Sequence, residues 1–129
     1  MATINQFEDI IAWQKDRELC KIIHTLIQKD AFSKDFRLVS QIKGSSGSIM
    51  DNIAEEFERG GNKEFIQFLY IAKGSAGETR SQLYRAIDND FITKEEFENT
   101  FQLTKQISKL ISGFIAHLKS SKLKGDKFN

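Results

Sequence analysis

The stretch that decides the fold is Lys43–Phe65, KGSSGSIMDNIAEEFERGGNKEF. Its residues Gly44 to Gly47 have the composition of a loop, whereas the residues after them have the composition of a helix. The apolar stripe that crosses this stretch advances at steps of 3, 4, 3, 4 and 4, through Val39, Ile42, Ser46, Ile49, Ile53 and Phe57. This is the spacing of one face of an α-helix, and it passes through Gly44 to Gly47 without a change of phase. We therefore predict one continuous helix, ended by Gly60 and Gly61, where glycine permits left-handed backbone.

Interior glycines weaken a helix, because each costs about 1 kcal/mol relative to alanine. The next predicted helix contains a second patch of small residues, Gly74 to Gly77. Small side chains let a neighbouring backbone approach closely, which is the usual compensation. We expect the two patches to meet each other or a partner chain.

Apolar residues at three- and four-residue steps predict three further helices. They are expected from about Glu8 to Lys29, from Asn62 up to Asp88, and from Thr93 to Leu118, with Asp30 to Asp35 as a polar connector. Thr93 and Glu96 have the spacing of a capping box at the start of the last helix. The expected fold class is all-α, an antiparallel up-down-up-down four-helix bundle.

Length and composition are those of one folded domain. The chain has 129 residues, no proline and 29% charged residues. We expect residues 1–118 to form the bundle and residues 119–129, which lack an apolar period, to form a disordered basic tail. The longest apolar run, Phe68 to Ala72, is too short to cross a membrane. The start of the chain has no signal-peptide pattern and Cys20 is the only cysteine, so we expect a cytoplasmic protein.

Charge is divided unevenly along the chain. Residues 1–118 carry 15 basic and 17 acidic residues, whereas residues 119–129 carry four lysines and one aspartate. The body is therefore slightly acidic and the end is basic. Lysines that could contact the phosphates of a nucleic acid are Lys43, Lys119, Lys122, Lys124 and Lys127. A lysine-rich end also serves solubility alone, and this alternative stays open.

Motifs for phosphate loops, metals and catalysis are weak. Gly44 to Gly47 has neither the Lys-Ser/Thr pair nor the preceding strand of a nucleotide-binding loop. It matches the GXXG pattern of KH domains, but a KH domain needs a sheet, which the pattern here does not predict. Neither His24 nor His117 follows a glutamate by three residues, as a di-iron bundle requires. Cys20 is expected to be a small buried thiol. We predict no catalytic residue, no metal site and no cofactor, and hence a protein that is not an enzyme.

A polar stripe lies beside the apolar one on the helix that contains Gly44 to Gly47. Its members are Ser45, Ser48, Asn52, Glu55 and Arg59. One interpretation is a solvated face with a Glu55–Arg59 ion pair. The other is a partly buried network that fixes helix register or joins subunits, which serine and asparagine favour because they form helices poorly in open solvent.

Aromatic residues at helical spacing are expected to be core residues and not platforms for stacked bases. These are Phe65, Phe68, Phe97, Phe101 and Phe114. Trp13 and Tyr70 suit either a core or an interface.

Several segments resemble one family. The start FEDIIAWQK (7–15), then LVSQI (38–42), NIAE (52–55) and KEF (63–65), together with Gly74, Ser75, Glu78 and Leu83, resemble the bacterial four-helix-bundle proteins encoded in intervening sequences of 23S ribosomal RNA genes. Members carry a ribosomal-protein label because of where their genes lie, and the label is no evidence of residence in ribosomes. The resemblance covers nearly the whole chain.

What the resemblance implies is mainly structural. It implies an antiparallel four-helix bundle that assembles into a closed ring, with five copies as the expected number, and it adds Glu78 to the polar stripe as a candidate interaction residue. The family is also similar to the accessory protein of diversity-generating retroelements, a basic pentamer that binds nucleic acid and a reverse transcriptase. A homo-oligomer associated with RNA is therefore expected, and a protein-binding scaffold is the alternative.

The sequence departs from the family pattern on the helix that contains Gly44 to Gly47. Lys43, Gly44 and Ser45 stand where the family tends to have two arginines and an alanine. Met50 stands in place of a proline, and Glu56 in place of a glycine. The lost arginines and the added carboxylate weaken the expectation that RNA binds on this helix.

Overall fold

The computed structural model describes residues 4–60 and 62–123, with the backbone only at residues 62 and 121–123. Its helices are η1 (Phe7–Asp9), α1 (Ile11–Leu26), α2 (Asp30–Ser33), α3 (Phe36–Arg59), α4 (Asn62–Asp88) and α5 (Lys94–Leu123). No strand occurs within these residues. The prediction of an all-α protein is confirmed.

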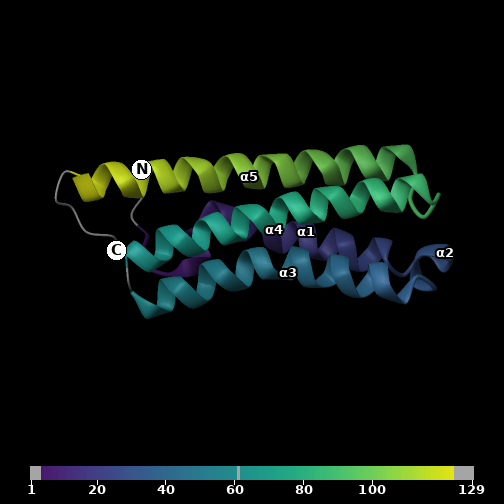
Figure 1. Ribbon diagram of the computed structural model, residues 1–129, viewed down its shortest axis with the longest axis horizontal. Helices are drawn as coiled ribbons and strands as arrows, with labels where there is room; N and C mark the ends of the chain where they lie inside the picture. Colours follow the sequence, from purple (N-terminus) through teal and green to yellow (C-terminus); the bar gives the residue numbers. More distant parts are fainter. Residues whose placement is uncertain (1–3, 61, 124–129) are drawn as a thin grey trace.

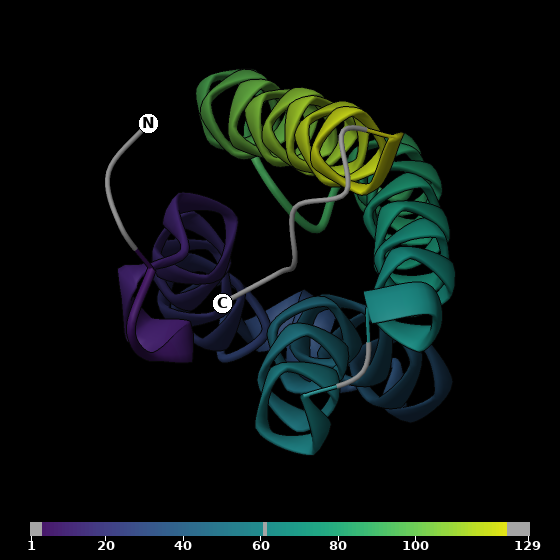
Figure 2. The ribbon, with the colours of Figure 1, turned by 90° about the vertical axis from the view of Figure 1, so that its left-hand side faces the viewer.

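The four long helices α1, α3, α4 and α5 lie side by side around one core (Figure 1). Viewed from the end, α4 lies between α3 and α5, and α1 packs on α3 and α5 from the other side (Figure 2). The end of α3 and the start of α4 lie at one end of the molecule, and the end of α4 and the start of α5 lie at the other (Figure 1). All four long helices contribute large side chains that are fully buried: Leu19, Ile23, Leu38, Ile42, Ile49, Ile53, Phe65, Leu69, Leu83, Ile107 and Ile111.

Helix α3 runs through Gly44 to Gly47 without a break, as the periodicity predicts. At its start, the side chain of Asp35 accepts a hydrogen bond from the backbone N–H of Leu38. It ends at Gly60, which has a φ of 74° and therefore uses the left-handed conformation open to glycine.

The interior glycines of α3 and α4 do not touch a neighbouring helix. A Cβ atom built on Gly44, Gly47 or Gly74 would have no atom within 4 Å. The expectation that the glycines permit a close approach is therefore wrong within one chain. Ser75 of the second small-residue patch does meet α3, where its hydroxyl oxygen lies 3.1 Å from that of Ser48, the residue that follows the first patch.

The segment predicted as a polar connector contains a short helix, α2, and a core residue. Phe32 is completely buried, and its ring stacks on that of Phe91 at 5.3 Å between centroids. One apolar residue among polar neighbours has no periodicity, so the sequence pattern does not reveal its burial. Its partner lies beyond α4, and only the tertiary structure brings the two together.

The predicted first helix is also divided. The short η1 comes first, Ile10 is extended (φ −77°, ψ 118°), and α1 begins at Ile11 and ends at Leu26. At the other end of the chain, α5 continues to Leu123, beyond Leu118 where we placed the end of the bundle. No proline or glycine lies between Leu118 and Leu123, so nothing in this segment breaks the helix.

The capping box at the start of α5 is present. The backbone N–H of Thr93 donates to Oε1 of Glu96 at 2.8 Å, and the N–H of Glu96 donates to Oγ1 of Thr93 at 3.1 Å. The ammonium of Lys29 also donates to Glu96, and this bond together with that from Thr93 lowers the pKa of Glu96. The same carboxylate therefore caps α5 and ties it to the segment that follows α1.

Candidate functional site

The first residue of the predicted polar stripe, Ser45, lies in the seam between α3 and α4. Its hydroxyl is 2.8 Å from Oγ1 of Thr79 and donates to Oε1 of Gln82 at 2.6 Å. All three side chains are buried. Ser45 therefore belongs to a polar network that holds two helices of one chain in register.

Ser48 and Asn52 continue this seam. Nδ2 of Asn52 donates to the hydroxyl of Ser48 at 2.9 Å and to its carbonyl at 2.7 Å, while Ser48 in turn meets Ser75 of α4. Both side chains are partly buried. Ser48 and Asn52, like Ser45, therefore belong to a partly buried polar network, and the contacts of this network lie within one chain.

The charged members of the stripe lie outside the seam. Glu55 and Arg59 are exposed and form a 3.8 Å ion pair, as the solvated-face interpretation predicts. Nε of Arg59 also lies 3.4 Å from Oε2 of Glu56. Glu78 accepts a 3.5 Å hydrogen bond from Gln82, which places it at the edge of the α3–α4 seam.

Glu56 itself is almost completely buried, with 1% of its surface exposed. Neither carboxylate oxygen accepts a hydrogen bond from the part of the chain that the structure describes. The argument that this added carboxylate weakens RNA binding on α3 is therefore wrong, because the group is buried.

A shallow groove of about 390 Å³ lies along the outer face of α3. Its lining residues are Lys43, Gly44, Gly47, Ser48, Asp51, Asn52 and Glu55. Lys43 thus shares the groove with two carboxylates, which oppose phosphate binding there. Gly44 and Gly47 line this groove, and because they have no side chains they leave space in it.

Of the lysines predicted to contact nucleic acid, the two whose side chains the structure describes lie on different helices. Lys43 lies on α3, whereas Lys119 lies on α5, where its ammonium donates to the hydroxyl of Tyr70 at 2.8 Å. Lys122 is within α5, but its side chain lies outside the described residues. Lys124 and Lys127 lie outside them altogether.

A surface that sequence reasoning missed runs along the outer seam of α4 and α5, and we name it the α4–α5 strip. It is formed by Tyr70, Lys73, Arg80 and Tyr84 of α4 and by Phe97, Phe101, Lys105 and Lys119 of α5. Tyr84 is half exposed and packs on Phe97 and Phe101 at centroid distances of 5.1 and 5.5 Å. The expectation that Phe97 and Phe101 are core residues is only partly met, since both are partly exposed.

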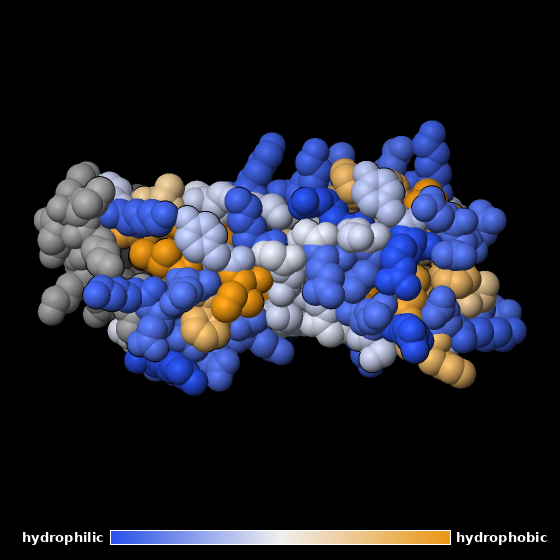
Figure 3. Space-filling view, viewed as in Figure 1, coloured by the Kyte–Doolittle hydropathy of each residue, from blue (hydrophilic) through white to orange (hydrophobic). Residues whose placement is uncertain are grey.

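Three of the four cations of the α4–α5 strip lie against neutral groups. Lys105 Nζ lies 5.8 Å from the centroid of the Phe101 ring, and Lys119 Nζ lies 5.2 Å from that of Tyr70. Nη1 of Arg80 donates to Oγ of Ser108 at 3.3 Å. In the view of Figure 3, pale and orange residues interrupt the blue of the surface over α4 and α5. The strip thus combines positive charge with aromatic surface.

A buried acid lies between α1 and α3. Asp16 is completely buried, and its Oδ2 accepts the backbone N–H of Met50 at 3.0 Å, while Oδ1 has no partner among the described residues. Burial raises the pKa of Asp16 to about 7, although the bonds from Met50 and Cys20 oppose the rise. Neither the buried acid nor its contact with Met50 was predicted, because a single aspartate in a helix gives no signal.

The thiol of Cys20 lies beside this acid, 3.7 Å from Oδ2 of Asp16 and 3.8 Å from the sulfur of Met50. Burial, and next the charge of Asp16, raise the pKa of Cys20 to about 12. The thiol therefore stays protonated near neutral pH and is a poor nucleophile.

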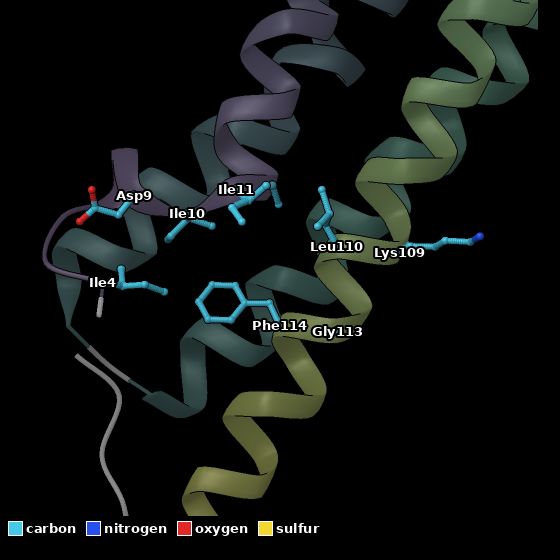
Figure 4. A pocket seen from close by; sticks show the side chains of 9 residues that line it. Ile4, Asp9, Ile10, Ile11, Lys109, Leu110, Gly113 and Phe114 are labelled. Atoms are coloured by element: carbon cyan, nitrogen blue, oxygen red, sulfur yellow. The ribbon is translucent and has the colours of Figure 1, made fainter. Parts of the chain in front are cut away.

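An apolar pocket of about 360 Å³ opens between the start of α1 and α5 (Figure 4). Ile4, Ile10 and Ile11 extend toward Leu110 and Phe114, whereas the side chain of Lys109 points away from it. The pocket offers apolar surface and no polar group aimed at its centre.

His24 and His117 are exposed on α1 and α5. Among the described residues, no three His, Cys, Asp or Glu side chains converge as they would around a metal ion. None of the described helices has both the length and the apolar character needed to cross a membrane.

Comparison with known proteins identifies the family. The profile of the 23S rRNA-intervening sequence protein family matches residues 8–113. A crystal structure of a protein of unknown function from the S23 ribosomal protein family of Bacteroides thetaiotaomicron superposes with a TM-score of 0.74 at 29% identity, over 82% of this chain and 96% of that chain. No curated protein matches this sequence. The chain belongs to the 23S rRNA-intervening sequence protein family.

Proposed function

We propose that this protein is a cytoplasmic, self-associating helical bundle that acts without catalysis, as an accessory factor bound to nucleic acid. The observation that carries the nucleic-acid role is the charge of α5. From Asn99 to Leu123 it contains Lys105, Lys109, Lys119 and Lys122 but no aspartate or glutamate. A basic stripe along one helix is the electrostatic footprint of a nucleic-acid-binding protein.

The opposite charge gathers on another helix. Residues 51–58 of α3 include three exposed carboxylates, those of Asp51, Glu55 and Glu58, besides the buried Glu56. A near-neutral net charge therefore conceals a basic α5, and a polyanion is expected to approach the α5 side of the subunit.

Titration of the purified protein into labelled single-stranded RNA at several salt concentrations tests this role. We expect micromolar or tighter binding that weakens steeply with salt, because phosphate contacts release counterions. Absence of binding even at low salt would contradict the nucleic-acid role.

The alternative is a protein-binding scaffold without a nucleic-acid role. The apolar pocket between α1 and α5 favours it, since 55% of the surface of Ile11 is exposed at its edge. A protein that fails to bind RNA but loses a protein partner on Ile11→Glu substitution would fit the scaffold and not the accessory factor.

Self-association into a closed ring of about five antiparallel bundles is the second part of the proposal. The groove on α3 supports it. Gly44 and Gly47 line this groove, and no contact within the chain explains why these positions lack side chains. The family resemblance on the segments quoted above supports it as well. A neighbouring subunit that packs closely on these residues would account for glycines that otherwise only weaken the helix.

The substitution Gly47→Leu tests where subunits meet. Leucine is a better helix former than glycine, and a Cβ atom at position 47 would have no atom of the chain within 4 Å, so we expect the subunit to stay folded with unchanged helical content. We expect light scattering to give the mass of a multimer for the unchanged protein and of one chain for the variant. A wild-type mass of one chain would contradict self-association, and a multimeric variant would contradict the α3 groove as the contact.

A further inference from the structure

The cations of the α4–α5 strip are not neutralised by nearby acids. Within the described residues, no carboxylate lies within 4.0 Å of Lys73, Arg80, Lys105 or Lys119, although five such contacts occur elsewhere. Glu78, the acid of α4 closest in sequence to Arg80, accepts a hydrogen bond from Gln82, whose side chain contacts Ser45 of α3. The positive charge of the strip is therefore available to an anionic ligand.

Aromatic rings mark both ends of the strip. Tyr70 and Tyr84 are 48% and 50% exposed, and the helical rise between them is roughly 21 Å. At about 3.4 Å per nucleotide, this length matches roughly six nucleotides of a stacked single strand. Lys73 and Arg80 lie between the two tyrosines on the same face of α4, since Lys73 is three residues after Tyr70 and Arg80 is four residues before Tyr84.

The ring of Tyr84 is held in position before any ligand arrives. Phe97 and Phe101 stack on each other at 5.2 Å, and Tyr84 leans on both at interplanar angles of 55° and 76°. A ring that is already fixed loses little freedom on binding. Lys105 sits on the outer side of the same cluster, where its ammonium can meet a phosphate.

We propose that the α4–α5 strip binds single-stranded nucleic acid, with a base stacked on Tyr84 and phosphates paired with Lys73, Arg80 and Lys105. This proposal rests on the nucleic-acid role proposed above. It adds where the ligand binds and that the ligand is single-stranded. Bases within a duplex are already stacked and paired, so they are not free to meet a ring on a convex helical surface. Unpaired bases are free to do so, and every base has a face that stacks.

The test compares variants within the strip with matched variants outside it. The probe is a labelled oligoadenylate of about twelve nucleotides, alone and in a duplex with oligouridylate. Tyr84→Ser removes the stacking ring and Phe36→Ala removes an 81%-exposed aromatic at the start of α3. Lys105→Gln removes a strip cation and Lys21→Gln removes an exposed cation of α1. Circular dichroism checks that each variant stays helical.

We expect the single strand to bind at least tenfold more tightly than the duplex, and Tyr84→Ser to lower its affinity about tenfold. Lys105→Gln should also reduce the slope of log affinity against log salt by about 0.7, the value for one phosphate contact on a single strand. Phe36→Ala and Lys21→Gln should leave affinity and slope within about twofold of the unchanged protein.

Three other outcomes would overturn either the nucleic-acid role or the assignment of the site to the α4–α5 strip. If the unchanged protein binds neither probe, both the nucleic-acid role and the strip fail. If it binds but Tyr84→Ser and Lys105→Gln bind equally well, the strip fails and the nucleic-acid role stands. If the two variants instead lower the mass of the assembly in light scattering and leave RNA affinity unchanged, the strip is a contact between subunits.

Discussion

Substitution of Phe32 by alanine is expected to lower the free energy of unfolding by about 3–5 kcal/mol. The ring is completely buried and stacks on Phe91, which lies between α4 and α5. Its removal leaves a cavity where the α1–α3 connection meets the α4–α5 connection. Urea denaturation of the variant and the unchanged protein measures the difference directly.

Phe36 supplies the matched control for this experiment. It is four residues further along the chain and 81% exposed, so Phe36→Ala should change the free energy of unfolding by less than about 0.5 kcal/mol. A Phe32→Ala variant as stable as Phe36→Ala would show that α2 does not pack on the bundle in solution.

The second large effect concerns the buried Asp16, where Asp16→Asn is expected to stabilise the protein above neutral pH. Burial raises the pKa of Asp16 in the folded protein from 3.8 to about 7, so the folded protein holds the carboxyl proton more tightly than the unfolded chain does. Raising the pH from about 4 to 7 therefore favours the unfolded chain, and the loss is complete above pH 7. Three pH units correspond to about 4 kcal/mol as an upper value.

Asparagine keeps the oxygen that accepts the N–H of Met50 but carries no titrating proton. Its amide group adds donors that lack a partner, which offsets part of the gain. We expect Asp16→Asn to raise the free energy of unfolding by about 2 kcal/mol at about pH 8, and to flatten its decline between about pH 4 and 7.

The control is Asp30→Asn, which changes a side chain that is 91% exposed. It should leave the pH dependence of unfolding in urea unaltered. If Asp16→Asn shows the same decline with pH as the unchanged protein, Asp16 is already ionised in the folded state and the burial argument is wrong.

The polar stripe of α3 could be predicted from the sequence only in part. The serines and asparagine of the stripe were recognised as unusual for a solvated helix face, and Ser45, Ser48 and Asn52 do lie in a polar seam. The same pattern did not say that the seam joins α3 to α4 of one chain. The burial of Glu56 is not predicted by the sequence, because helical spacing gives the direction of a side chain but not the neighbour that covers it.

The sequence by itself determined the four long helices of this protein and the family to which it belongs. Apolar steps of three and four residues act within one helix, and they carried α3 through Gly44 to Gly47 and located the stop at Gly60. Capping is equally local, which is why Thr93 and Glu96 could be paired in advance.

Only the tertiary structure decided the contacts between segments far apart in the chain. It buried Phe32 against Phe91, placed Asp16 on the backbone of Met50, and set Tyr84 on the rings of Phe97 and Phe101. Each contact joins residues from different helices or their connections, whose relative rotation and height are fixed by packing of the whole core. Local periodicity contains neither quantity, so the α4–α5 strip and the buried acid emerge only when the helices are packed together.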